Sequence, residues 1–436
     1  MEVPRLLMTS FIRLLPSLMW RMPSATDPAL CAKCKGVRRL CGRPTCPILK
    51  RIIESLKVAH KVRKRVLPAA TPPSVLVGEH GYPSVRLGPI AAPVRGEEAQ
   101  QYEDYKGWWG RLSLEDIISI RASTIYSSFS LRVREARSRE NRLLEATREA
   151  ALSARPVDAE FVYAKPPRPS LSFNGMLAPV GLRGELNKLE IVENPIVPRR
   201  VDQLVYDTDA KVRDAIQELY RSGIDNYYIT RLLSLGMLGE KNRRRLVPTR
   251  WAITAVDKML GDLLLDRVRL MSEYPKLELY SAEYLGNRYL ILLAPGPWSF
   301  EMVEIWLPRS VWVKESKPYI AVNYELWDGR WRRPGVDGGY YAMRFPVLEF
   351  LAEKKRQATV IAIREVTPNY YAPVGSWQIR ESVRRALRSK PLTLEDVNEA
   401  LREISKRIDT SVRLVVREST ILRSLLSPRI RLTDFM

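Results

Sequence analysis

All four cysteines of this 436-residue chain lie in one short segment, LCAKCKGVRRLCGRPTCPILK. They are Cys31, Cys34, Cys41 and Cys46, which gives the spacing C-x2-C-x6-C-x4-C. Four thiolates on a chain that doubles back are typical of a tetrahedral Zn²⁺ site. The segment therefore predicts a structural zinc ion near the N-terminus. Two disulfides and an iron–sulfur cluster are the alternatives.

The chain is strongly basic, with 71 Lys and Arg residues against 49 Asp and Glu residues and a formal net charge of +22. Such a charge attracts polyanions. Proteins of hyperthermophiles are also rich in charged residues, so composition alone does not identify nucleic acid as the partner.

Residues 6–20 form an apolar stretch that Arg13 and Pro16 interrupt. The stretch is too short and too broken to span a bilayer. We expect translation to start at Met22, shortly before the cysteine cluster. The rest of the sequence has no run that is long and apolar enough for a membrane span, which predicts a soluble, cytoplasmic protein.

A cationic helix is predicted directly after the cluster, beginning at Pro47. Its expected buried face consists of apolar residues at helical spacing: Ile48, Ile52, Leu56, Ala59 and Val62. Its basic residues are Lys50, Arg51, Lys57, Lys61, Arg63, Lys64 and Arg65. This composition predicts contact with backbone phosphates. A solvated face without a ligand is the alternative.

The remaining chain mixes helical and strand patterns. Aromatic and β-branched runs between residues 277 and 327 predict an antiparallel sheet, and helical patterns precede and follow it. The predicted fold class is α+β, with a small zinc-binding segment followed by a large mixed domain. The expected units are an N-terminal extension (1–27), the zinc cluster with the basic helix (28–66), the α+β core (67–422) and a flexible tail (423–436).

Four short motifs, GEHGYP, VPTRW, GGYY and PVGSW, are candidates for a ligand pocket. Glycines allow close approach of the backbone, while arginines and aromatic rings can clamp phosphates and stack bases. The candidate residues in and around these motifs are His80, Arg245, Arg250, Trp251, Arg344, Trp377 and Arg380. If the motifs converge, they would form a site for a phosphate-bearing ligand. Sheet packing and ion pairs within helices are the alternative.

The segment YDTDAKVRDAIQELYRSG predicts a helix that begins at Thr208 or Asp209 and ends at Gly223. Helix capping explains the acidic residues here, because carboxylates accept hydrogen bonds from exposed N-terminal amides. The other interpretation is that Asp207 and Asp209 are weak catalytic candidates, which would hold Mg²⁺ or Mn²⁺ in a nuclease.

Taken in order, the cysteine cluster and the segments VGEHGYPSVRLGP, SLEDIISIRAS, VRDAIQELYRSG, RRLVPTRWAITAVDK, GGYYAMRFPVLEFL and PVGSWQIRESVRRAL resemble the archaeal Nre family of DNA-repair proteins. The resemblance runs from about residue 28 to the C-terminus. It implies a cytoplasmic, nucleoid-associated archaeal protein that acts on damaged DNA. It also implies a zinc-finger-like N-terminal segment and a C-terminal motif that binds the sliding clamp PCNA.

The clamp motif would lie in the last residues, SPRIRLTDFM, with Arg429, Leu432, Phe435 and Met436 at its key positions. A single 3-10 turn would place Leu432 and Phe435 on one side, ready for an apolar pocket. Arg429 stands where such motifs have Gln, and Met436 stands where they have a second aromatic residue.

We therefore expect a repair factor that binds DNA and is recruited to PCNA through its tail. The alternatives are a metal-dependent nuclease or another enzyme on nucleotides or nucleic acids, and an RNA-binding or tRNA-processing protein.

Overall fold

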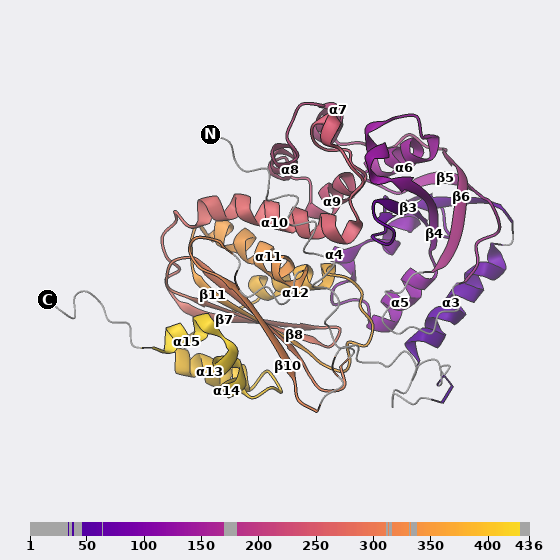
Figure 1. Ribbon diagram of the computed structural model, residues 1–436. Helices are drawn as coiled ribbons and strands as arrows, with labels where there is room; N and C mark the ends of the chain where they lie inside the picture. Colours follow the sequence, from indigo (N-terminus) through magenta and orange to yellow (C-terminus); the bar gives the residue numbers. More distant parts are fainter. Residues whose placement is uncertain are drawn as a thin grey trace.

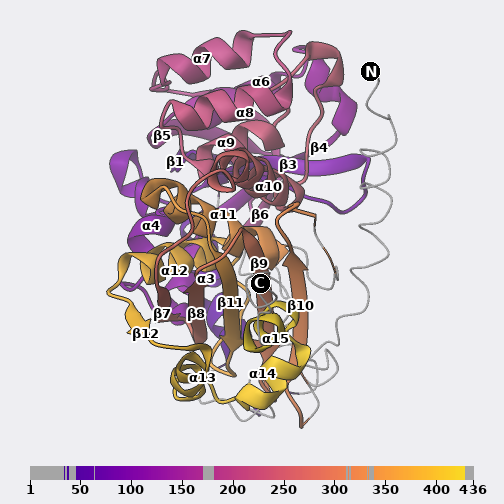
Figure 2. The ribbon, with the colours of Figure 1, turned by 90° about the vertical axis from the view of Figure 1, so that its left-hand side faces the viewer.

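Two six-stranded sheets and the helices packed around them form the part of the chain that the structure describes (Figure 1). The computed structural model describes residues 34, 37–38, 46–62, 64–169, 181–310, 313, 316–330, 332 and 338–427. The predicted α+β fold class is confirmed. Figure 2 shows the two sheets one above the other, the first together with α6–α9 and the second near the C-terminal helices.

The first sheet has the strand order β1-β5-β6-β4-β3-β2. Its strands are β1 (Val66–Thr71), β2 (Val75–Val77), β3 (Ser84–Ala91), β4 (Ile125–Arg132), β5 (Val157–Tyr163) and β6 (Leu182–Ile191). Burial alternates along β5 and along most of β6, as expected for a sheet with one face on the core. Ala159 and Phe161, for example, are buried in the main core, whereas Glu160 between them is partly exposed. The first sheet therefore leaves polar side chains on its other face.

The second sheet has the order β10-β9-β11-β8-β7-β12. Its strands are β7 (Leu277–Tyr284), β8 (Asn287–Ala294), β9 (Ser299–Trp306), β10 (Tyr319–Glu325), β11 (Thr359–Val366) and β12 (Leu392–Leu394). Every residue of β9 and β11 is buried, because helices cover both faces of this sheet. Val360 and Ala362 face the main core, whereas Ile361 and Ile363 face the C-terminal helices.

Within residues 277–327 the pairs β7–β8 and β9–β10 are antiparallel as predicted, but the complete sheet is mixed. Strand β11 lies between β8 and β9, antiparallel to β8 and parallel to β9. The chain reaches this position through α11 (Gly338–Lys354), which connects the edge strand β10 to the centre of the sheet. The parallel strands β9 and β11 are thus joined by a long crossover that consists of β10 and α11, because parallel strands cannot be joined by a tight turn.

The helices before and after the second sheet form its two coverings. One layer contains α10 (Thr249–Val268), α11 and α12 (Trp377–Arg388), and the other contains α13 (Val397–Ser405), α14 (Val412–Glu418) and α15 (Thr420–Leu426) (Figure 1). The remaining helices are α3 (Pro47–Lys61), α4 (Tyr105–Trp108), α5 (Leu114–Ala122), α6 (Arg142–Leu152), α7 (Arg199–Tyr206), α8 (Val212–Arg221) and α9 (Asn226–Ser234). Three 3-10 turns, η2 (Gly96–Tyr102), η3 (Val133–Arg137) and η4 (Lys241–Arg243), complete the described elements.

Two details of the predicted helices are corrected. Helix α3 begins at Pro47 as predicted, but Leu56 is 48% exposed and Ser55 takes its place on the buried face, where its hydroxyl donates to the Ala122 carbonyl. Helix α8 begins at Val212, later than predicted, because Asp207 closes a separate turn before it.

A short aromatic segment that includes α4 joins the half of the molecule with the first sheet to the half with the second sheet. It lies between η2 and α5, and Tyr105 stacks on Trp377 of α12 with ring centroids 5.6 Å apart. The indole N–H of Trp109 donates to the Ser382 hydroxyl at 2.8 Å, and the Tyr284 hydroxyl donates to the Trp108 carbonyl at 2.8 Å. These contacts hold the second sheet and α12 against the first half of the chain.

Among the helices of the described residues, none has both the length and the apolar composition that crossing a membrane requires.

Candidate nucleic-acid interface

The structure divides the predicted pocket residues into a buried group and an exposed group. Arg344, Trp377 and Arg380 are buried, with exposed fractions of at most 3%. His80, Arg245 and Arg250 are exposed, and Trp251 is half-buried. The four motifs therefore do not form one common pocket for a ligand.

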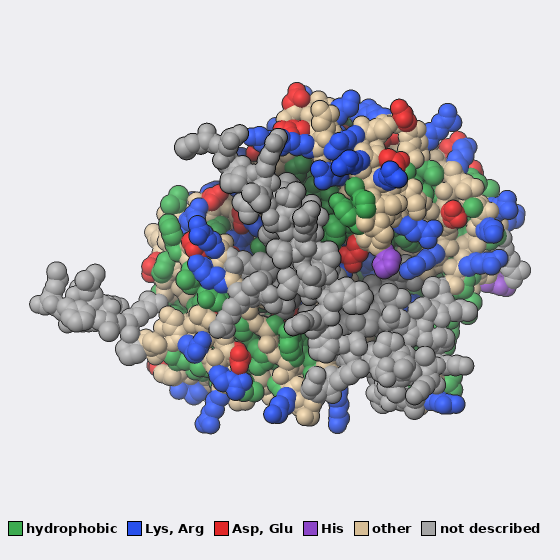
Figure 3. All heavy atoms as spheres, in the orientation of Figure 1, with side chains coloured by type: hydrophobic (Ala, Val, Ile, Leu, Met, Phe, Trp, Pro, Cys, Tyr) green, Lys and Arg blue, Asp and Glu red, His purple; other side chains and the backbone are tan. Residues whose placement is uncertain are grey.

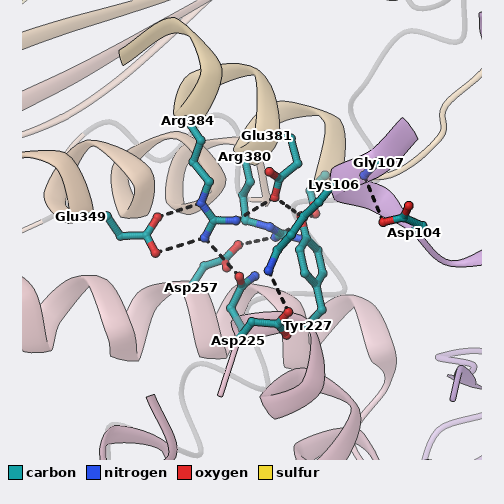
Figure 4. A network of polar contacts seen from close by, with 12 residues as sticks. Asp104, Lys106, Gly107, Asp225, Tyr227, Asp257, Glu349, Arg380, Glu381 and Arg384 are labelled. Carbon is teal, nitrogen blue, oxygen red and sulfur yellow. Dashed lines mark hydrogen bonds and ion pairs between the residues drawn. The ribbon is translucent and has the colours of Figure 1, made fainter. Parts of the chain in front are cut away.

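Arg380 belongs to a buried polar network where α9, α10, α11 and α12 meet (Figure 4). Its Nη1 lies 2.6 Å from Oδ2 of Asp257 on α10. Burial raises the pKa of the Asp257 carboxyl, and the adjacent Arg380 offsets part of that rise. On the next turn of α12, Arg384 contacts Glu349 at 2.8 Å and Glu381 at 2.7 Å. These guanidiniums bind carboxylates of the protein itself, which favours the ion-pair interpretation for this part of the prediction.

Arg344 on α11 is bound in the same manner. Its Nε contacts Glu325 at 2.8 Å, and its Nη1 contacts Asp262 at 3.0 Å. Glu325 also accepts hydrogen bonds from the Trp298 indole and the Tyr340 hydroxyl. The GGYY motif therefore packs inside the protein, and Arg344 forms ion pairs with two carboxylates of the chain.

The exposed group converges at the start of α10. The 78–83 turn, which carries the GEHGYP motif, lies beside VPTRW because the Val77 amide donates to the Thr249 hydroxyl at 2.9 Å. Arg250 forms an ion pair with Glu79 at 2.9 Å. The rings of Tyr82 and Trp251 pack with centroids 5.1 Å apart. This part of the predicted convergence is confirmed.

Backbone hydrogen bonds bring two further segments to the same place. The Val133 amide donates to the Pro83 carbonyl at 2.9 Å, and the Leu246 amide donates to the Val133 carbonyl at 2.9 Å. The residues before and after Val133, and the residue before Leu246, are arginines. These contacts therefore place Arg132, Arg134 and Arg245 around the 78–83 turn.

Strand pairing adds one more guanidinium. In the β3–β4 ladder Arg86 pairs with Ser130 and Ser84 pairs with Arg132, and all four residues lie on the exposed face of the first sheet. Together Arg86, Arg132, Arg134, Arg245 and Arg250 form what we call the arginine surface. Lys and Arg side chains recur over this half of the molecule in the space-filling view (Figure 3).

The sequence analysis did not single out Arg86, Arg132 or Arg134. The signal was the alternation of polar and apolar residues in SVRL and FSLRVR, which is typical of strands with one exposed face. The mixed charges of residues 131–152 are typical of an exposed helix, but only α6 is helical over its length there, since β4 extends to Arg132 and η3 follows it.

The basic helix α3 contributes a smaller charged surface than predicted. Arg51 is buried, and burial lowers the pKa of its guanidinium, as does the nearby Arg183. Lys57 is exposed and pairs with Glu54 at 2.8 Å, whereas Lys64 and Arg65 are exposed just beyond the helix. Lys50 is half-buried, and the Lys61 side chain and Arg63 lie outside the described residues.

Asp207 and Asp209 lie at the surface before α8. The Asp207 carboxylate accepts hydrogen bonds from the Asp209 and Ala210 amides, both at 2.9 Å. These donors lower the pKa of Asp207. Within the described residues no cluster of three potential metal ligands occurs, here or elsewhere.

The cysteine cluster is described in part. Cys46 is the N-cap of α3, and its sulfur accepts a hydrogen bond from the Leu49 amide at 3.5 Å. Cys34 is buried. Cys31 and Cys41 lie outside the described residues, as do Arg429, Leu432, Phe435 and Met436 of the tail.

Comparison with known proteins adds evidence that covers nearly the whole chain. The family model described as "Archaeal Nre, N-terminal" matches residues 40–313, and "Archaeal Nre, C-terminal" matches residues 325–435. No solved structure gives a significant match.

Three named relatives are similar to this chain over most of its length. The chain is 36% identical over 399 residues to "DNA repair protein NreA" of Archaeoglobus fulgidus, covering 90% of this chain and 98% of the relative. It is 33% identical to "DNA repair protein NreB" of the same organism, covering 90% of this chain and 97% of the relative. It is also 36% identical to "DNA repair protein NreA" of Haloferax volcanii, covering 81% of this chain and 86% of the relative.

Proposed function

Because the chain belongs to the archaeal Nre family, we propose that it is a DNA-repair protein and that the arginine surface is where it contacts DNA. The names of its relatives from Archaeoglobus fulgidus and Haloferax volcanii support the repair role. The net charge of +22 is consistent with a polyanionic partner.

The observation that carries the proposal is how few of the guanidiniums on the arginine surface form ion pairs with the described residues. Within the described residues Arg86, Arg132, Arg134 and Arg245 form no ion pair, and Arg250 pairs only with the half-buried Glu79. Exposed guanidiniums that no carboxylate neutralises are suited to phosphate oxygens, which they bind in a bidentate manner. Such contacts supply affinity and position, and their strength depends on salt.

A matched pair of double variants tests the surface. Arg132→Ala/Arg245→Ala removes two charges from it, and Arg402→Ala/Arg413→Ala removes two exposed charges from α13 and α14. Fluorescence anisotropy with labelled DNA at several salt concentrations measures both the affinity and its salt dependence.

We expect the first variant to lose about tenfold or more in affinity and to reduce the salt slope by about one unit for each arginine. The control variant should bind like the wild type. Equal affinities for the wild type and both variants would exclude the arginine surface as the DNA contact. The same mixtures with Mg²⁺ or Mn²⁺ would reveal nuclease activity as strand cleavage.

We also propose that the four cysteines hold a structural Zn²⁺. Support comes from Cys46, because its sulfur caps the first turn of α3 and would link the metal to a helix that packs on α5. Metal analysis of the purified protein should find one zinc per chain. Iron would indicate a cluster instead, and absence of both metal and free thiols would indicate disulfides.

We further propose that the C-terminal motif binds PCNA, with Leu432 and Phe435 entering an apolar pocket on the clamp. Phe435→Ala should abolish clamp binding and leave DNA affinity nearly unchanged. Full clamp binding by this variant would contradict the assignment.

A further inference from the structure

The centre of the arginine surface is an aromatic pair. Tyr82 and Trp251 are both half-buried, and their ring planes are inclined by 48°. The backbone holds each of them firmly. Tyr82 lies in a turn closed by a hydrogen bond of 2.9 Å from the Ser84 amide to the Gly81 carbonyl, and Trp251 lies in the first turn of α10.

A positive φ of 81° at Gly81 is part of this turn, and a side chain there would be strained. The fold therefore fixes the position of the aromatic pair, and both residues are partly exposed to solvent.

The guanidiniums flank the pair on separate segments. Arg250 is the neighbour of Trp251 in sequence, and Arg132 and Arg134 flank Val133, which is hydrogen-bonded to the residue after Tyr82. Arg245 is held near the pair because the next residue, Leu246, donates its amide hydrogen bond to the Val133 carbonyl. Positive charge thus lies on more than one side of two partly exposed rings.

We propose that the arginine surface binds single-stranded DNA, with phosphates on the arginines and unstacked bases against Tyr82 and Trp251. This inference rests on the proposed function and narrows it to one form of DNA. Aromatic rings stack only on bases whose faces are free, and combining such rings with a cationic track is how proteins bind single strands. In a duplex the base faces are already stacked on one another.

The helix at this surface is not available to read a duplex. Proteins that read duplex DNA commonly insert an exposed helix into the major groove. Helix α10 instead lies across the core, with Ala252, Val256 and Leu260 fully buried. Only its first turn reaches the arginine surface, which suits contact with a flexible strand.

Two other aromatic groups among the described residues differ from this one. Tyr105, Trp108 and Trp377 form part of a buried cluster between the two halves. Trp327 is 51% exposed with Arg269 over its ring, but Arg269 is paired with Asp266 at 2.7 Å. Trp327 is therefore a matched control, because it is an exposed tryptophan beside a neutralised arginine.

The experiment compares Trp251→Ala, Trp251→Phe and Trp327→Ala with the wild type. Fluorescence anisotropy measures binding to one labelled sequence as single-stranded DNA, as blunt duplex DNA and as RNA. Thermal unfolding of each variant shows whether it remains folded. Tyr82→Ala is a second variant that tests the same stacking without changing α10.

We expect Trp251→Ala to lose about tenfold in affinity for single-stranded DNA and to bind the duplex like the wild type. Trp251→Phe should recover most of the loss because it keeps a ring face, and Trp327→Ala should have no effect.

Unchanged single-strand binding by both Trp251→Ala and Tyr82→Ala would overturn the inference, as would an equal loss on single strands and duplex. Tighter binding of RNA than of DNA would overturn it in favour of an RNA ligand. If the wild type binds duplex DNA through its arginines without using the aromatic pair, only this inference fails. If the wild type binds no DNA at all, the proposed function fails as well.

Discussion

The arginines of the α10–α12 layer and those of the arginine surface lie in opposite environments. Arg344 and Arg380 have exposed fractions of 1–2%, and each contacts a carboxylate at 2.6–2.8 Å. Arg132 and Arg245 are exposed, and neither guanidinium forms an ion pair with the described residues.

The difference teaches that burial decides what an arginine binds. A guanidinium taken out of water needs a carboxylate and further hydrogen bonds to offset its desolvation. Asp257 and Glu325 supply this inside the protein. At the surface water solvates the guanidinium, so its hydrogen-bonding capacity remains available for a phosphate.

The largest effect should follow from breaking a buried pair. Arg380→Met leaves Asp257 buried without its cation, and we expect the free energy of unfolding to fall by about 3–5 kcal/mol. Arg132→Ala should change it by less than about 0.5 kcal/mol, because that side chain is exposed. Urea denaturation of the two variants measures both values. Similar losses in both would contradict the distinction between the two groups.

A second buried carboxylate tests how the C-terminal helices are held. Glu301 of β9 accepts hydrogen bonds from the Thr420 amide at 2.6 Å and the Ile421 amide at 3.1 Å at the start of α15. Glu301→Gln keeps the size but loses the charge, and we expect a destabilisation of about 1–3 kcal/mol. Limited proteolysis should then cut first within residues 397–427. Proteolysis that begins in the first sheet would contradict this role.

The ion pair between Lys106 and Asp225, at the junction between the two halves, should make the stability of the protein depend on acidic pH. Burial would raise the pKa of Asp225, but Lys106 and the Tyr228 amide lower it below its usual value. A lowered carboxyl pKa contributes stability above the unfolded-state pKa of about 4, and this contribution is lost as the pH falls further. Asp225→Asn should therefore flatten the loss of stability below about pH 4. Thermal unfolding between pH 3 and pH 7 measures this, and identical curves for both proteins would exclude it.

The smallest effect concerns Glu79, a carboxylate that forms an ion pair on the arginine surface. Glu79 pairs with Arg250, whose side chain is 62% exposed, so the pair contributes little to stability. Glu79→Gln should raise the affinity for single-stranded DNA by about two- to fivefold, because it frees Arg250 and removes a repulsive charge. Glu97→Gln, an exposed change on η2, is the control. A loss of affinity in Glu79→Gln would show that Glu79 is needed to position Arg250.

The sequence by itself determined the class of fold, the family and many of the elements. Strand patterns at 277–325 and the helical pattern after Gly338 reflect local periodicity, which side-chain burial imposes on each element. Pro47 at the first position of α3 and the Ser113–Asp116 capping box of α5 are local signals of helix starts.

Only the tertiary structure decided which charged residues face inward. Arg344 and Arg380 became internal because Asp262, Glu325 and Asp257, distant in sequence, lie opposite them. The segments that carry Arg132 and Arg245 were brought together by a backbone hydrogen bond from the Leu246 amide to the Val133 carbonyl. A sequence pattern records the spacing along one element. The partner that neutralises a charge, or the water that leaves it available, depends on how the elements pack.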